Sequence, residues 1–136
     1  MSDKPLFTLP IRIYYEDTDT GGLVYHANYL KFMERARTDF LRSIGCEHQS
    51  LMAQKSMFVV VDCALSFKRS AQLDDLIHIT EKIESISKVK LIFQQQVWRD
   101  GALLCEGRFV IASVHSETLR PIAIPEKLRN KYHQTK

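Results

Sequence analysis

Apolar and polar residues alternate in several segments of the chain, and one longer segment has helical spacing instead. The first alternating segment starts near Leu9 and continues to about Glu16. A period of two predicts a half-buried strand that runs into the acidic residues that follow. Helical spacing comes next and ends at Gly45, a common residue just past a helix end; its apolar positions are Tyr29, Leu30, Phe32, Met33, Ala36, Phe40, Leu41 and Ile44. They cover about half of the helix circumference, which predicts a helix pressed into a concave surface.

Four further strands are predicted after this helix, around residues 58–67, 77–80, 89–97 and 105–113. The turns between them are short, and a short closing helix is expected after Pro125. The order of elements predicts an α+β fold in which a five-stranded antiparallel sheet wraps around one long central helix. The edges of so small a sheet have to be paired or covered, so we expect a dimer.

Length and composition indicate one ordinary domain. The chain has 136 residues, of which 45% are hydrophobic, and this is enough for one core. We therefore expect a single domain over residues 1–136 with loose ends at about 1–6 and 130–136. The first residues lack an apolar run behind a basic cluster, and the apolar stretches are too short to span a membrane. These features predict a cytoplasmic protein.

Charge and cysteine content argue against several functions. The net charge is +3, but the basic residues are scattered and form no stripe of the kind that binds nucleic acid. Three cysteines without C-x-x-C spacing predict neither a disulfide framework nor a zinc site. The histidines have no ligand spacing either. We expect no metal and no cofactor.

Three carboxylates precede the predicted helix in the stretch YYEDTDTGGLVYHANY, residues 14–29. If the strand stays extended, Asp17 and Asp19 lie on its buried side, and a carboxylate in such surroundings is a candidate general base. The alternative is a polar loop whose aspartates accept hydrogen bonds from backbone amides. A calcium loop is disfavoured because, counted from Asp17, Gly21 takes a ligand position and Asn28 replaces the bidentate glutamate.

The residues after the acids predict a site for an oxyanion. Gly21 and Gly22 allow the backbone to approach a ligand closely. The helix expected to begin near His26 offers unpaired N–H groups and the positive end of its dipole. A carboxylate such as Asp19 on one side of a carbonyl group, with N–H donors on the other, is suited to acyl transfer.

The whole pattern resembles a known signature. The pattern D-T-D-x-x-G-x-V-Y-H-x-x-Y at 17–29 and E-R-A-R at 34–37 are similar to those of the hydroxybenzoyl-CoA thioesterase group of hotdog-fold proteins. More narrowly, they resemble the Tol–Pal-associated acyl-CoA thioesterases of Gram-negative bacteria. The similarity continues through L-D-D at 73–75 and P-x-x-x-P at 121–125, and so covers nearly the whole chain.

This resemblance implies an acyl-CoA thioesterase that releases a free carboxylic acid and coenzyme A. It implies that Asp19 is the catalytic carboxylate, either as nucleophile or as general base, and that the backbone N–H of His26 polarises the thioester carbonyl. Tyr15 and the His26 side chain match further residues implicated in this subgroup. Substrate contacts are expected from Gly21, Gly22, Val24 and Tyr25. Lys88 and Lys90 match basic residues that meet the phosphates of coenzyme A, and the alternative for both is a solvated charged turn.

The resemblance also implies an assembly and partners. It implies a hotdog dimer with a continuous sheet, often paired into a tetramer, with active sites between subunits. Coenzyme A is part of the substrate. Acyl carrier protein or lipid-synthesis enzymes are candidate partners, at the inner face of the bacterial inner membrane. An alternative function is a scaffold that binds acyl-CoA or acyl carrier protein and links lipid synthesis to the Tol–Pal system. A dehydratase of the same fold is a third candidate, usually served by a different motif.

Two further predictions concern the helix and the cysteines. Glu34 and Arg37 lie three residues apart, with Arg37 inside the apolar arc, so we expect them to form a partly buried ion pair. The cysteines have no histidine at a telling spacing, and we expect them to pack in the core rather than to act as nucleophiles.

Overall fold

The computed structural model describes residues 4–135. Within this range the chain forms, in order, β1 (Phe7–Arg12), the short 3-10 helix η1 (Tyr15–Asp17), α1 (Asn28–Ser43), α2 (His48–Ala53), β2 (Ser56–Phe67), β3 (Leu76–Ile86), β4 (Lys90–Arg99), β5 (Ala102–His115) and α3 (Glu126–Gln134). As expected, the chain leaves α1 through Gly45, whose φ of 78° is in the left-handed region that glycine tolerates.

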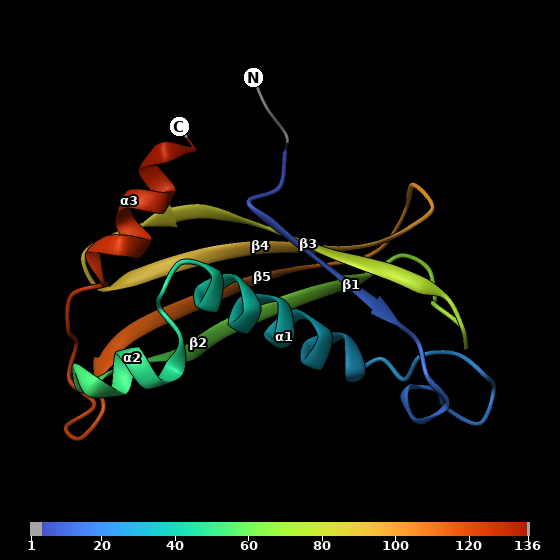
Figure 1. Ribbon diagram of the computed structural model, residues 1–136. Coiled ribbons are helices and arrows are strands. Elements are labelled where there is room, and N and C mark those ends of the chain that lie inside the picture. The colour runs from blue at the N-terminus through green and yellow to red at the C-terminus, as the bar shows by residue number, and fades with distance from the viewer. Residues whose placement is uncertain (1–3, 136) are drawn as a thin grey trace.

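The five strands form one antiparallel sheet with the order β1-β3-β4-β5-β2. Helix α1 lies against one face of this sheet, while α2 and α3 lie toward one end of it (Figure 1). A five-stranded antiparallel sheet that packs around a central helix confirms the predicted hotdog fold.

The core lies between α1 and the sheet. Helix α1 buries one stripe of residues, and the alternate residues of β4 that face it are also buried. The rings of Phe40 and Phe93 meet edge to face, with centroids 6.1 Å apart. Gly107 of β5 lets the helix come close, because a Cβ atom there would lie 3.0 Å from the sulfur of Met33 and 2.9 Å from Cε1 of Phe109. Burial of each such large side chain contributes about 1.5–3 kcal/mol.

Strand β1 ends earlier than the alternating pattern predicts. It stops at Arg12, and the chain then turns through η1. The N–H of Tyr14 donates to Oδ2 of Asp17, at 2.9 Å, and the N–H of Asp17 donates to the carbonyl of Tyr14, at 3.0 Å. The chain therefore does not stay extended through Asp19, because the Asp17 side chain closes a tight turn, and the alternative of a polar loop holds for this segment.

Two helical segments also differ from the sequence predictions. Residues 48–53, for which the sequence predicted neither helix nor strand, form α2, which buries Leu51. Residues 130–134, expected to be loose, continue helix α3. Leu128 and Tyr132 are four residues apart on one face of α3, and both are buried. Contact of these two side chains with the rest of the fold therefore stabilises the end of α3. The polar sequence of this segment gave no sign of that contact.

Strand β2 occupies one edge of the sheet, and in the single chain this edge has no neighbouring strand. Val60, Val61 and Phe67 on this strand are about half exposed, at 49%, 51% and 50%. A long edge with apolar side chains is a surface that proteins usually pair or cover. None of the helices in the described range is long and apolar enough to cross a membrane.

Candidate active site

The loop between β1 and α1 carries the predicted catalytic residues and is folded back on itself. Thr18 and Val24 form an antiparallel bridge. The N–H of Val24 donates to the carbonyl of Ala71, at 2.9 Å, and the N–H of Ala71 donates to the hydroxyl oxygen of Tyr29, at 3.0 Å. Burial raises the pKa of Tyr29, which keeps this hydroxyl protonated. These bonds pin the loop to the connection between β2 and β3, residues 68–75.

That connection is itself fixed by Asp75, the last residue of the L-D-D motif. Its Oδ2 accepts hydrogen bonds from the N–H of Gln72, at 2.8 Å, and from Nη1 of Arg99, at 2.7 Å. Partial burial raises the pKa of Asp75, but the bonds from Gln72 and Arg99 outweigh it and hold the pKa below its usual value. The motif therefore has a structural role here.

Asp17 holds the two ends of the loop together. Besides its side-chain bond to Tyr14, its carbonyl accepts the N–H of Tyr25, at 3.1 Å, and Nδ2 of Asn28, at 2.8 Å. The sequence analysis named Asn28 only in the rejected calcium loop and gave it no role in holding the loop. The only signal was its place at the start of the predicted helix, where asparagine commonly bonds nearby backbone.

Asp19 lies at the tip of the loop and is exposed. Its Oδ1 accepts the N–H groups of Gly21, at 2.9 Å, and Leu23, at 3.2 Å. Gly22 completes the turn with a φ of 81°, a conformation that favours glycine. Within residues 4–135, Oδ2 of Asp19 makes no hydrogen bond. The turn-forming and catalytic interpretations are thus compatible, because one oxygen shapes the loop and the other is free.

Three aromatic rings stand beside this loop where it enters α1. The rings of Tyr25 and His26 have centroids 4.6 Å apart, and the ring of Phe67 meets His26 edge-on at 6.1 Å. Phe67 was missed from the sequence because nothing local links the end of β2 to this loop. Among the hydrogen bonds of the described residues, none uses the backbone N–H of His26. This donor is therefore available to an oxyanion.

The remaining predicted site residues differ in exposure and in their distance from Asp19 in the single chain. Tyr15 is 82% exposed on η1, and Val24 is buried in the core. Lys88 and Lys90 lie at the turn between β3 and β4, where the carbonyl of Lys88 accepts the N–H of Ile124, at 2.9 Å. Strand β3, with 11 residues and a length of about 35 Å, separates this turn from the catalytic loop. One chain does not bring the two lysines to Asp19.

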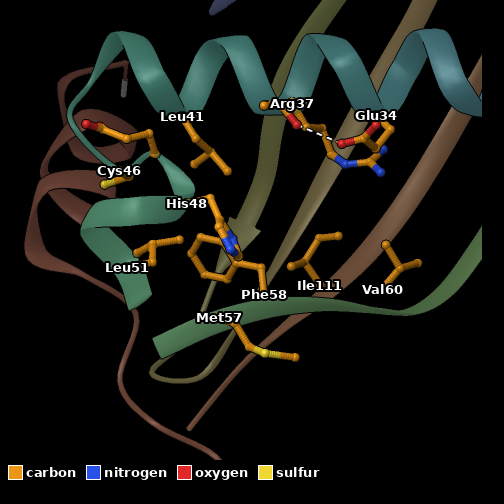
Figure 2. Close-up of a pocket in the computed structure, with 12 residues that line it drawn as sticks. Glu34, Arg37, Leu41, Cys46, His48, Leu51, Met57, Phe58, Val60 and Ile111 are labelled. Carbon is orange, nitrogen blue, oxygen red and sulfur yellow. Dashed lines mark hydrogen bonds between the residues drawn. The ribbon is translucent and has the colours of Figure 1, made fainter. Parts of the chain in front are cut away.

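A cavity of about 320 Å³ lies between α1, α2 and β2 (Figure 2). Its walls are mainly apolar, with a polar group of residues on the α1 and α2 sides; the lining residues are Glu34, Arg37, Thr38, Leu41, Cys46, Glu47, His48, Leu51, Met57, Phe58, Val60 and Ile111. The volume is at the lower end of the roughly 300–1,000 Å³ common for small-molecule sites. Sequence reasoning did not find this cavity, because its walls come from four separate elements.

The predicted ion pair between Glu34 and Arg37 is replaced by two other interactions. Glu34 accepts the hydroxyl of Thr38, at 2.8 Å. Nη1 of Arg37 donates to Oε1 of Gln95, at 2.9 Å, and the guanidinium carbon lies 4.2 Å from the centre of the Phe109 ring. The Arg37 side chain thus points into the core, where it contacts Gln95 of β4 and Phe109 of β5 and not Glu34.

Gln95 connects Arg37 to a buried carboxyl group. Its Nε2 donates to Oε1 of Glu81, at 3.2 Å, and both residues are fully buried. Burial raises the pKa of Glu81 to about 8, although the nearby charge of Arg37 works in the opposite direction. In the described residues Oε2 of Glu81 has no hydrogen-bond partner. Burial therefore favours the protonated form of Glu81 in the folded chain.

Thiol and metal chemistry find no support in the described residues. Cys46 and Cys105 are buried, and burial raises the pKa of Cys105 to about 12 and that of Cys46 above its usual value. Cys63 is exposed on β2, so the expectation that all three pack in the core was wrong for this residue. No group of three or more potential ligands lies close enough to hold a metal ion within residues 4–135.

The fold and the loop agree with comparisons to known proteins. The thioesterase-like superfamily matches residues 14–132, which include the loop, α1 and the sheet from β2 onward. The chain therefore belongs to the thioesterase-like superfamily.

Individual relatives narrow this similarity. The chain is 36% identical over 131 residues to the acyl-CoA thioesterase YbgC of Haemophilus influenzae, with 96% of each chain covered. It is 38% identical over 130 residues to the acyl-CoA thioester hydrolase YbgC of Escherichia coli O6:H1, which covers 95% of this chain and 97% of that protein. A crystal structure of a probable thioesterase from Bartonella henselae superposes with a TM-score of 0.82 at 33% identity, covering 87% of this chain and 98% of that one.

Proposed function

We propose that the protein is an acyl-CoA thioesterase that hydrolyses an acyl-CoA to a free carboxylic acid and coenzyme A. The observation that carries this proposal is the loop of residues 17–29, where an exposed carboxylate with one free oxygen and an unused backbone N–H lie on one short segment. The YbgC relatives are named as acyl-CoA thioesterases, which supports the same reaction.

Asp19 and His26 take the two roles that acyl transfer needs. The N–H of His26 donates to the thioester oxygen and stabilises the negative charge that develops there. Asp19 either attacks the carbonyl carbon to give an acyl-enzyme anhydride, which water then hydrolyses, or takes a proton from water that attacks directly. In both routes the carbon–sulfur bond breaks and coenzyme A leaves as the thiolate, which takes up a proton from water or from the protonated Asp19. No metal or further cofactor takes part.

The enzyme acts as a homodimer joined through β2, in this proposal. The support is the unpaired edge of β2 with its half-exposed Val60, Val61 and Phe67. Antiparallel pairing of β2 along its length with a second copy sets Phe67 of each chain beside the Ser56 end of the other. His26 lies against Phe67, so each catalytic loop then faces the cavity of the second copy. The same symmetry brings the turn with Lys88 and Lys90 of one chain to the end of the sheet that carries the loop of the other, where they can meet coenzyme A.

The resemblance to the Tol–Pal-associated thioesterases supports further proposals for the assembly, the partners and the location of the protein. They are a tetramer built from two such dimers, acyl carrier protein or lipid-synthesis enzymes as partners, and a place on the cytoplasmic face of the inner membrane near the Tol–Pal system. Tyr15, Gly21, Gly22, Val24 and Tyr25 contribute to the substrate site in this proposal.

Thiol release from a panel of acyl-CoA thioesters tests the reaction, with Asp19→Asn as the decisive variant. The asparagine oxygen can still accept the N–H groups of Gly21 and Leu23, so the loop keeps its shape while the carboxylate is lost. We expect kcat to fall at least about 100-fold, the usual effect of removing a general base. Asp39→Asn, on the outer part of α1, is the matched control and keeps its turnover.

Each negative result has a separate meaning. Full turnover by the Asp19→Asn variant would contradict the role of Asp19. Tight binding of acyl-CoA by the wild-type protein, without release of thiol from any thioester, would instead favour the scaffold function.

A further inference from the structure

Arg37 is a buried cation that forms no ion pair with an acid within residues 4–135. Its side chain is only 8% exposed and makes one hydrogen bond within residues 4–135, to the neutral amide of Gln95. The aromatic face of Phe109 supplies part of the stabilisation that water would give. Buried arginines are usually paired with an acid, because desolvation of an isolated charge is costly.

Neither nearby acid forms an ion pair with Arg37 within residues 4–135, although the charges of Glu81 and Glu34 both act to raise the pKa of Arg37. Glu34 is exposed at the margin of the cavity, and its carboxylate takes the hydroxyl of Thr38. Glu81 is linked to Arg37 by hydrogen bonds only through Gln95, and burial raises its pKa to about 8, which favours its neutral form. Burial lowers the pKa of Arg37, yet an arginine remains charged under these conditions.

Arg37 also forms part of the wall of the cavity between α1, α2 and β2. Figure 2 shows it on the side of α1 turned toward Ile111 and Val60, which with Phe58 form an apolar floor. The cavity therefore combines an apolar space with polar groups in its wall. Arg37 is the strong hydrogen-bond donor among them, and Glu34, Glu47 and His48 also line the wall. Such a site fits a ligand that is mostly apolar and carries one acceptor.

We propose that this cavity receives the acyl group of the thioester and that Arg37 selects acyl groups that carry an oxygen acceptor, a hydroxyl, oxo or carboxylate group, away from the thioester carbon. This inference rests on the proposed thioesterase function and on the dimer that turns each catalytic loop toward the cavity of the other chain. An unsubstituted chain in the cavity displaces water from Arg37 and offers it no acceptor. A substituted chain replaces that water with a charge-assisted hydrogen bond.

Three thioesters of equal carbon number test this selection in the wild-type enzyme. They are the coenzyme A thioesters of hexanoic acid, 6-hydroxyhexanoic acid and hexanedioic acid. We expect at least one of the two oxygenated substrates to have a kcat/KM about ten- to a hundredfold above that of hexanoyl-CoA, the range for a hydrogen bond to a charged group. The hydroxyl and carboxylate arms show which acceptor the site prefers.

Variants of Arg37 assign the preference to this residue. In Arg37→Met the ratio of kcat/KM for the preferred oxygenated thioester over hexanoyl-CoA falls at least tenfold. Arg37→Lys keeps the positive charge but loses the planar guanidinium group with its several N–H donors. Its ratio should lie between that of the wild-type enzyme and that of Arg37→Met. Arg42→Met, an exposed arginine on the same helix and outside this cavity, leaves the wild-type ratio in place.

The outcomes separate this inference from the proposed function. Hydrolysis of hexanoyl-CoA as fast as or faster than both oxygenated thioesters by the wild-type enzyme overturns the selection but leaves the thioesterase standing. An equal loss on all three substrates in the Arg37 variants reduces Arg37 to a structural role. If no variant folds, inhibition of the wild-type enzyme by the free acids decides. We expect hexanedioate or 6-hydroxyhexanoate to inhibit at a lower concentration than hexanoate. The reverse order overturns the proposal. Failure to release thiol from any acyl-CoA overturns the thioesterase itself.

Discussion

Replacement of Glu81 by glutamine should remove a pH dependence of stability that is built into the core. Glu81 is fully buried, and its carboxyl group accepts one hydrogen bond, from Gln95. The folded chain raises the pKa of Glu81 from 4.5 to about 8. Between these two values the folded chain holds a proton on Glu81 that the unfolded chain has released.

The sign and size of the effect follow from this difference. The stabilising contribution of protonated Glu81 is complete below pH 4.5 and is lost as the pH rises toward 8. At about 1.4 kcal/mol for each pH unit, the loss across the whole window is at most about 5 kcal/mol. Glutamine has no proton to release, so the Glu81→Gln variant lacks this part of the dependence.

Urea unfolding at pH 5, 6, 7 and 8, at one fixed protein concentration, measures this difference. The free energy of unfolding of the wild-type protein should fall relative to that of Glu81→Gln as the pH rises. Glu84→Gln is a matched control on the same strand. Its carboxylate is held by Arg108, which lowers the pKa of Glu84, so its contribution is lost in acid and not in this window. Parallel curves for the wild-type protein and Glu81→Gln would refute the reasoning.

Two further predictions concern the packing of α1 and the support of the catalytic loop. Gly107→Ala places a Cβ 2.9 Å from Phe109 and 3.0 Å from Met33, so it should destabilise the fold by about 1–3 kcal/mol, measured by urea unfolding; an unchanged midpoint would show that the helix has room to shift. Tyr29→Phe leaves the buried N–H of Ala71 without its acceptor and should cost about 1–3 kcal/mol. Its hydrogen–deuterium exchange at Ala71 should speed up, and wild-type protection there would contradict the role of this bond.

Local patterns were enough to predict most of the elements. The helical spacing that ends at Gly45 corresponds to α1, and the alternating segments correspond to the five strands. These predictions succeeded because a helix or strand repeats its buried face every few residues. Helix α2 was not predicted because six residues give too little periodicity. The end of β1 was not predicted because it depends on one hydrogen bond to the side chain of Asp17.

The candidate site also has some features that the sequence revealed and others that only the structure revealed. The aspartates, the glycines and His26 lie within one short stretch, so the sequence displays them together. Sequence alone did not reveal which oxygen of Asp19 is free, or that Phe67 stands beside His26. Nor did it reveal that Lys88 lies a strand length away from the loop in the same chain.

The sequence by itself determined the order of helix and strands, the family signature and the residues that can carry acyl chemistry. Tertiary structure alone decided the partner of Arg37, which bonds Gln95 of β4, 58 residues away, and not Glu34 on the next turn of its own helix. It also decided the proton on Glu81 and the cavity between α1, α2 and β2. The physical reason is that periodicity and motifs are local properties of the chain. Desolvation, charge balance and enclosed space depend on which distant segments the fold brings into contact.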